Sequence, residues 1–191
     1  LGDRLNDSIY SNGYAVTDDQ KDVAIGGNLK TADKYKMVNK INQKFVDVIR
    51  ATGGNNANRH LLIPGYNTEF EKTVDAKFVM PTDTAENGKT KLFVSVHYYT
   101  PWDFCGDGGA GSYTYGERQK TVEYFENLKR FSDEGYAYII GECGVCSPQT
   151  VTGSVTTWFN DTFKEAAKYH AVPVLWETGQ YFDRTAATLK F

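Results

Sequence analysis

The stretch YAYIIGECG, residues 136–144, decides how this chain folds. Its first five residues are apolar or aromatic, a run too short for a helix and suited to a buried strand. The run ends in Gly141-Glu142, so a carboxylate follows directly on the apolar segment. Three similar runs occur in the chain, and together the four predict strands at 61–63, 92–99, 136–141 and 172–176.

Helical segments alternate with these strands. Apolar residues recur at helical spacing in three segments and predict helices over 32–51, 117–133 and 155–169, whereas residues 1–30 are polar and predict a long loop. In the first helix the predicted buried face consists of Met37, Val38, Ile41, Phe45, Val48 and Ile49. The alternation indicates an α/β fold with a parallel sheet. Four such strands make half of an eight-stranded β/α barrel, and an open four-stranded sheet is the alternative.

Composition excludes several classes of function. The 191 residues are enough for one domain with a sizeable core. A formal net charge of −3 provides no basic field, so we expect no nucleic-acid partner. No apolar run approaches the ~20 residues of a membrane span, so we expect no membrane partner. We also expect no metal, because no second Cys or His cluster lies near Cys143 and Cys146 in the sequence, and no cofactor, because the glycine-rich stretch 106–111 lacks the Lys-Ser/Thr end of a phosphate loop.

Polar and aromatic residues gather where the predicted strands end. Tyr66-Asn67 follows the first strand, HYYTPW (residues 97–102) ends the second, Glu142 ends the third and Trp176-Glu177 ends the fourth. The carboxyl ends of parallel strands meet at one edge of the sheet, which is where the active sites of β/α barrels and the ligand crevices of open sheets lie.

Glu142 and its predicted neighbours have both catalytic and structural interpretations. A carboxylate between two glycines can attack the anomeric carbon of a sugar, but it can equally cap a helix or pair with an Arg. His97 and Tyr99 are two apart on one strand, so they face the same side and can orient that carboxylate. Each alone is as compatible with a packed core, and Trp176 suits either a sugar platform or a core. Their combination favours a sugar site.

Three segments together resemble glycoside hydrolase family 5, and within it the endoglucanases of plant-biomass degraders. They are VHYYTPWDF at residues 96–104, IGECG at 140–144 and VLWE at 174–177, in an order and spacing that match from about residue 31 to the C-terminus. The resemblance implies that the fold is the C-terminal half of a (β/α)₈ TIM barrel, strands 5 to 8. Residues 1–191 would then be a single partial catalytic domain.

The resemblance also implies an activity and residue roles. It implies a secreted, retaining endo-β-1,4-glucanase acting on cellulose or related β-glucans, with Glu142 as nucleophile and with His97 and Tyr99 contacting the nucleophile and the sugar. The substrate-binding residues that it implies are Trp176, Trp102, Tyr66 and Asn67. One departure is Cys143, which stands where the family usually has Phe.

A second departure concerns the acid/base carboxyl group. In the family it lies in an Asn-Glu-Pro motif, which this chain lacks, and the LGDR of residues 1–4 is similar to the stretch that follows that motif. Retaining hydrolysis needs two carboxyl groups roughly 5 Å apart. We expect no substitute among the other loop carboxylates, which are Glu69, Asp103, Glu177 and Asp183. We therefore expect the isolated chain to be inactive and to pair with the N-terminal half of the barrel, as a second chain or fragment, or with another copy of itself.

Two other functions remain open from the sequence. The surviving aromatic residues at the strand ends fit a catalytically inactive half-barrel that binds carbohydrate. The C-x-x-C of Cys143 and Cys146 fits a thiol-dependent α/β enzyme, although two small buried residues at a strand end explain it more simply.

Overall fold

The structure is a computed structural model that describes residues 31–85, 88–106, 108–109, 111–146, 152–177, 179 and 181–189. The predicted loop at residues 1–30, including the LGDR stretch, lies outside the described residues. The described chain divides into two compact units. Unit 1 contains the described residues up to Val96 together with Arg130–Tyr138, and unit 2 contains those of His97–Lys129 and Ile139–Phe191.

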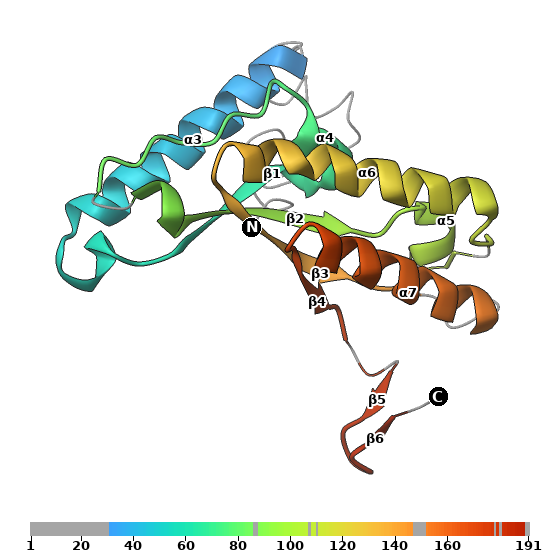
Figure 1. Ribbon diagram of the computed structural model, residues 1–191. Helices are drawn as coiled ribbons and strands as arrows, with labels where there is room; N and C mark the ends of the chain where they lie inside the picture. The colour runs from blue at the N-terminus through green and yellow to red at the C-terminus, as the bar shows by residue number, and fades with distance from the viewer. Residues whose placement is uncertain are drawn as a thin grey trace. The chain divides into compact units, whose positions relative to one another are not determined.

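Helices and strands alternate along the chain as predicted (Figure 1). The helices are α3 (Thr31–Ala51), α4 (Phe70–Val74), α5 (Trp102–Cys105), α6 (Tyr115–Asp133) and α7 (Thr152–Lys168), with 3₁₀ turns at Gly54–Ala57 and Gly88–Lys91. The strands are β1 (Leu61–Glu69), β2 (Leu92–Tyr98), β3 (Ala137–Cys143), β4 (Val172–Leu175), β5 (Phe182–Asp183) and β6 (Thr188–Leu189). The order in the main sheet is β1-β2-β3-β4, and β5 and β6 form a separate antiparallel pair.

In unit 1, β1 is longer than predicted. The sequence predicts an end at Pro64-Gly65, but the strand continues to Glu69. A proline is tolerated because β1 stands at the end of the strand order, where one side of the backbone makes no ladder bonds. The Pro64 carbonyl accepts a hydrogen bond from the buried Asn42 amide at 2.9 Å. Gly65 leaves room for α4, since a Cβ there would lie 1.8 Å from the Thr73 hydroxyl oxygen.

The predicted buried face of α3 is partly wrong. Met37, Phe45 and Val48 are exposed, and the residues that are buried are Tyr35, Val38, Asn42 and Val46. Periodicity identifies an apolar stripe but not which part of it a neighbour covers. Polar side chains fix the rotation of α3 instead, because Asn42 bonds to Pro64 and the Tyr35 hydroxyl donates to the Lys72 carbonyl at 2.9 Å.

The core of unit 2 forms around Tyr98. Its ring stacks on Trp158 of α7 and meets Phe125 of α6 edge to face, with centroids 5.8 and 5.2 Å away. All three side chains are fully buried. The Trp158 indole donates to the Thr100 carbonyl at 2.8 Å, which ties α7 to the segment that follows β2. In this way the helices of unit 2 hold the end of β2 in place.

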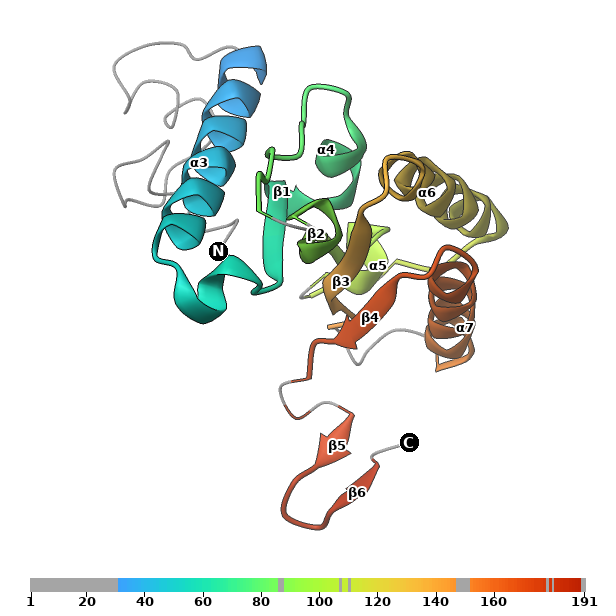
Figure 2. The same ribbon diagram turned by 60° about the vertical axis from the view of Figure 1, so that its left-hand side comes forward.

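Strands β3 and β4 pair in parallel (Figure 2), but their register is irregular. Ile140 is opposite Pro173 and Cys143 is opposite Leu175, so β3 has one residue more than β4 between these pairs. The burial pattern of β3 loses its alternation at the same place, where Gly141 and Glu142 are both half-buried. An extra residue of this kind changes the direction in which the neighbouring side chains point. None of the described helices is long and apolar enough to cross a membrane.

Candidate active site

Strand β2 presents His97 on the side opposite to its buried residues. Along β2 buried and half-buried residues alternate without interruption, with Val94, Val96 and Tyr98 buried. This period of two places His97 and the following Tyr99 on the other side, as predicted. The packing of Tyr98 in the core of unit 2 therefore fixes the direction of the residues on either side of it.

The irregular register of β3 sets the direction of the Glu142 side chain. In an uninterrupted strand Glu142 would share the side of Tyr138 and Ile140, which are buried. Because of the extra residue, Cys143 lies on that buried side instead. Glu142 points outward, and 28% of its side chain is exposed. The sequence places Glu142 just after a strand, whereas in the structure it is the last residue but one of β3. Gly141 is the only local signal of the irregularity.

Glu142, His97 and Tyr99 come together within unit 2. The Tyr99 hydroxyl donates a hydrogen bond to Oε2 of Glu142 at 3.1 Å, and Nδ1 of His97 lies 3.3 Å from the same oxygen. Both contacts fall on one oxygen of the carboxylate. The prediction that these three residues form one cluster agrees with this geometry.

Tyr99 stays protonated as a hydrogen-bond donor. Burial raises the pKa of its hydroxyl far above the usual value, and the negative charge and hydrogen bond of Glu142 raise it further. A neutral phenol beside a carboxylate holds that carboxylate in one orientation without neutralising it. Tyr99 is therefore a positioning group for Glu142.

Trp102 and Trp176 are both accessible aromatic side chains in unit 2. The Trp102 side chain is 64% exposed and meets the Tyr99 ring edge to face at 6.3 Å. Gly106 permits this position, because a Cβ there would come within 2.5 Å of the indole. Trp176 is 45% exposed, and its backbone N–H donates to the carbonyl of Cys143 at 2.8 Å. That bond fixes Trp176 beside Cys143, the residue that follows Glu142.

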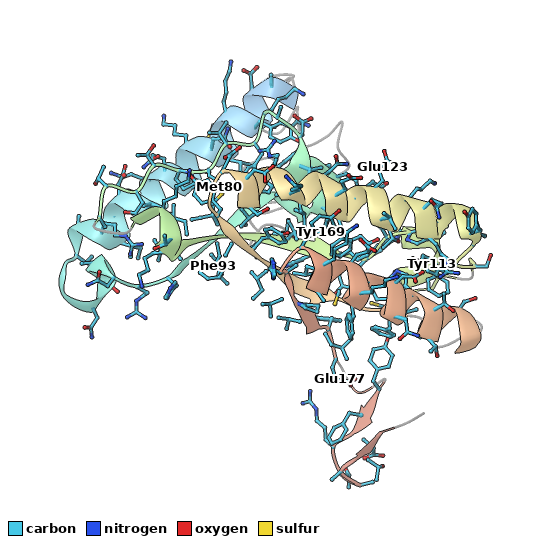
Figure 3. All side chains as sticks on the ribbon, in the orientation of Figure 1. Met80, Phe93, Tyr113, Glu123, Tyr169 and Glu177 are labelled. Atoms are coloured by element: carbon cyan, nitrogen blue, oxygen red, sulfur yellow. The ribbon has the colours of Figure 1, made fainter. Side chains whose placement is uncertain are left out.

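Tyr181, which is not among the residues predicted from the sequence, holds the loop that follows Glu142. Its hydroxyl accepts a hydrogen bond from the Val145 N–H at 2.9 Å and donates to the Val145 carbonyl, so one side chain holds both backbone groups of that residue. Glu177 holds Tyr181 in turn by accepting bonds from the N–H groups of Gly179 and Tyr181, the latter at 2.9 Å. Glu177 lies between β4 and the β5–β6 pair (Figure 3). No motif in the sequence signals this arrangement.

Tyr66 and Asn67 belong to unit 1. The Tyr66 ring is buried edge to face against Tyr35 at 5.0 Å. Asn67 has a φ of 57° and donates to the Glu69 carboxylate. Thr68 has a φ of 53°, which is costly for a β-branched residue, and such positions are concentrated at functional sites. Substrate contact by Tyr66 and Asn67 stays a prediction.

Three of the four other carboxylates make local contacts. Glu69 pairs with Lys72 at 2.7 Å, Glu177 accepts the bonds described above, and Asp183 accepts the N–H groups of Thr185 and Ala186, both at 2.9 Å. These bonds hold each carboxylate on its own loop. In the part of the chain that the structure describes, no group of three or more His, Cys, Asp or Glu side chains could hold a metal ion.

Cys105 and Cys143 lack the properties of catalytic thiols. Burial raises the pKa of Cys143 to about 12, and burial together with the nearby thiols raises that of Cys105 further. A catalytic cysteine needs the opposite, a pKa low enough for thiolate to form at neutral pH. This disfavours a thiol-dependent enzyme that uses Cys143.

Comparison with known proteins places the chain in a family. The model of the cellulase family, glycosyl hydrolase family 5, matches residues 17–182. The chain belongs to glycosyl hydrolase family 5. It is 33% identical over 169 residues to endoglucanase A of Paenibacillus barcinonensis, covering 76% of this chain and 42% of that protein. It is 31% identical over 198 residues to a xyloglucan-specific endo-β-1,4-glucanase of Bacteroides ovatus, covering 90% and 38%.

Solved structures share the fold. A broad-specificity endoglucanase from an uncultured bovine rumen ciliate matches with a TM-score of 0.73 and 30% identity, over 82% of this chain and 51% of that one. A lichenase of Caldicellulosiruptor in complex with cellotetraose also matches with a TM-score of 0.73, at 26% identity, over 84% and 47%. The chain thus spans about half the length of these structures. The predicted fold, the C-terminal half of a (β/α)₈ barrel, is confirmed.

Proposed function

We propose that this chain is the nucleophile-bearing half of a retaining endo-β-1,4-glucanase, with Glu142 as the nucleophile. The observation that carries the proposal is the contact of Tyr99 and His97 with a single oxygen of Glu142. Two neighbours on Oε2 fix the plane of the carboxylate. The other oxygen, Oε1, then remains to attack the substrate.

The proposed reaction has two displacements. Oε1 of Glu142 attacks the anomeric carbon while the bond from that carbon to the glycosidic oxygen breaks, and a carboxylic acid protonates the departing oxygen. Water then attacks the same carbon of the glycosyl-enzyme ester and loses a proton to the conjugate carboxylate. The released sugar keeps its β configuration, and the Glu142 carboxylate is restored.

The acid/base group is proposed to come from outside this chain. Glu69, Glu177 and Asp183 are held by local bonds, and the match to this chain covers only 42% and 38% of the two relatives. An N-terminal half of the barrel, with the chain or as a second chain, would supply the missing carboxyl group. The side chains of Val172, Val174 and Leu175 in β4 support such a partner because they are 57%, 42% and 39% exposed among the described residues.

We propose a β-1,4-linked glucan as the substrate. Relatives act on xyloglucan or bind cellotetraose, according to their descriptions, and these share a β-1,4-glucan backbone. Trp176 and Trp102 offer exposed indole faces, which pack well against the C–H faces of pyranose rings. A polymer of this kind stays outside the cell, so we also propose that the enzyme is secreted.

The nucleophile is tested by Glu142→Gln in the complete protein. We expect kcat to fall by about 10³-fold or more while cello-oligosaccharides still bind in calorimetry, because the amide keeps the shape but cannot form the ester. Asp103→Asn is the matched control, since Asp103 is an exposed carboxylate of α5 in unit 2. Near-normal turnover in Glu142→Gln would remove Glu142 from the reaction.

A second candidate function is carbohydrate binding without catalysis by the chain on its own. It is favoured by the exposed Trp102 and Trp176 side chains and by the absence of a second carboxylate bonded to the site among the described residues. Calorimetry with cello-oligosaccharides and a reducing-sugar assay on the isolated chain separate the candidates. Release of reducing sugar by that chain would show that it contains its own acid/base group.

A further inference from the structure

Cys105 and Cys146 are far apart in the sequence but adjacent in unit 2. Cys105 is the last residue of α5, and Cys146 lies three residues beyond the end of β3. The backbone N–H of Cys146 donates to the carbonyl of Cys105 at 2.7 Å. A backbone hydrogen bond brings the two residues close together, and in paired strands the residues that exchange such bonds have Cα atoms about 5.5 Å apart. Disulfides span Cα separations of about 4.4–6.8 Å.

Cys143 is directed elsewhere. Its sulfur contacts the carbonyl of Val174 in β4 at 3.5 Å, and its backbone carbonyl accepts the N–H of Trp176. Val145, between Cys143 and Cys146, is held through both backbone groups by Tyr181. These contacts keep Cys143 in the sheet with β4 and leave Cys105 as the closer partner of Cys146.

We propose that Cys105 and Cys146 form a disulfide in the exported protein and that Cys143 remains a thiol. The inference rests on the proposed secretion, because extracellular compartments allow disulfides to persist. The two thiols lose two protons and two electrons as the S–S bond forms. A low-molecular-weight disulfide such as oxidised glutathione accepts them and is reduced to two thiols.

The cross-link would join the two loops that flank the carboxylate. One loop carries Trp102 on α5, and the other begins directly after Glu142 and Cys143. The bond would therefore fix a proposed sugar platform relative to the proposed nucleophile. Cys105 is fully buried and Cys146 is half-buried, so soluble reductants would reach the bond only from the side of Cys146 once the protein is folded. Burial raises the thiol pKa of Cys105, which agrees with a bond that forms during folding rather than one that is switched afterwards.

Peptide mapping tests the inference without relying on activity. The complete protein is produced in an oxidising compartment, denatured with iodoacetamide in the absence of reductant, digested with trypsin and analysed by mass spectrometry. We expect peptide 92–118 linked to peptide 131–164, with separation after reduction. Cys143 and Cys146 share the second peptide, so fragmentation must locate the bond at Cys146 and the alkyl group at Cys143.

Two variants complete the test. Cys143→Ala should keep the linked peptides, whereas Cys146→Ser should lose them, leave Cys105 alkylated and lower the Tm. Three alkylated cysteines in the unreduced protein, or a bond between Cys143 and Cys146, would overturn the inference. An active glucanase with three free thiols would overturn the disulfide alone, and a linked but inactive protein would overturn the proposed activity alone.

Discussion

Strands β2 and β4 have similar apolar sequences and opposite surroundings. Strand β2 alternates buried and half-buried residues along its whole length, whereas three of the four residues of β4 are exposed. In the strand order β2 has a neighbour on each side, and β4 stands at the end. An apolar strand at an open edge invites pairing with another strand. The comparison teaches that β4 has the sequence of an interior strand but stands at the end of the sheet that the structure describes, an edge that the proposed N-terminal half would cover.

Lysine substitutions in the two strands test this comparison, and we expect them to have the largest effect on the free energy of unfolding. In the complete protein we expect Val94→Lys in β2 to destabilise the fold by about 4 kcal/mol or more, because it buries an unpaired charge. We expect Val174→Lys in β4 to cost about 2–4 kcal/mol, although Val174 is 42% exposed in this chain, because a completed barrel would cover it. Denaturant titrations measure both changes.

Tyr115→Lys is the matched control for an apolar side chain that should remain exposed. Tyr115 is 75% exposed at the start of α6, and we expect a change within about 0.5 kcal/mol. If Val174→Lys costs no more than this control, the edge of β4 is open in the complete protein and the comparison fails.

Hydrogen exchange sharpens the same comparison at the backbone. We expect amides of β4 (Val172–Leu175) to gain about 100-fold protection when the isolated chain is joined to the N-terminal half, because the open edge acquires a partner. Amides of β2 should change much less, since both neighbours of β2 are already present. Equal gains in β2 and β4 would mean that the whole chain becomes ordered on joining, rather than its edge alone.

Tyr181→Phe tests whether the segment after β4 supports the site. Loss of the hydroxyl removes both bonds to Val145 in the loop that follows Glu142. We expect kcat to fall roughly 10-fold with KM little changed, because misplacing a catalytic group costs turnover more than binding. A fall in kcat without a change in KM is the result expected of a positioning residue. A rise in KM alone would assign Tyr181 to substrate binding.

The smallest expected effect is on alkaline stability. Burial raises the pKa of Tyr181 from 10.0 to about 12, so between these values the unfolded chain loses a proton that the folded chain keeps. Tyr181 therefore lowers the stability of the fold as pH rises from about 10 to about 12. We expect a shallower decline of the free energy of unfolding over this window in Tyr181→Phe. An unchanged slope would show that Tyr181 titrates alike in both states.

The fold and the central cluster follow from patterns that act over short distances. Alternation along residues 92–99 places His97 and Tyr99 on one side, because a strand repeats every two residues. Apolar runs separated by helical segments predict the order of the main helices and strands, and the structure confirms it. These features depend only on local geometry, so they can be predicted from the sequence.

The remainder depends on contacts between distant residues. The rotation of α3 depends on Asn42 bonding to Pro64, and no periodicity reports that bond. The outward turn of Glu142 depends on a register change against β4. The C-x-x-C spacing draws attention to Cys143 and Cys146, whereas the fold brings Cys146 to Cys105. Residues that are close in sequence are therefore not always the ones in contact, because a loop can bring two distant segments together.

The location of Glu142, His97 and Tyr99 within a single unit makes the proposed enzyme a natural two-part reporter. One fragment would carry an oriented nucleophile and the other the proton donor, so neither would release sugar without the other. Fused to two interacting proteins, the fragments would turn over a chromogenic glucoside only when those proteins meet. The open edge of β4 would set the background signal, because spontaneous pairing there competes with pairing that the fused partners direct.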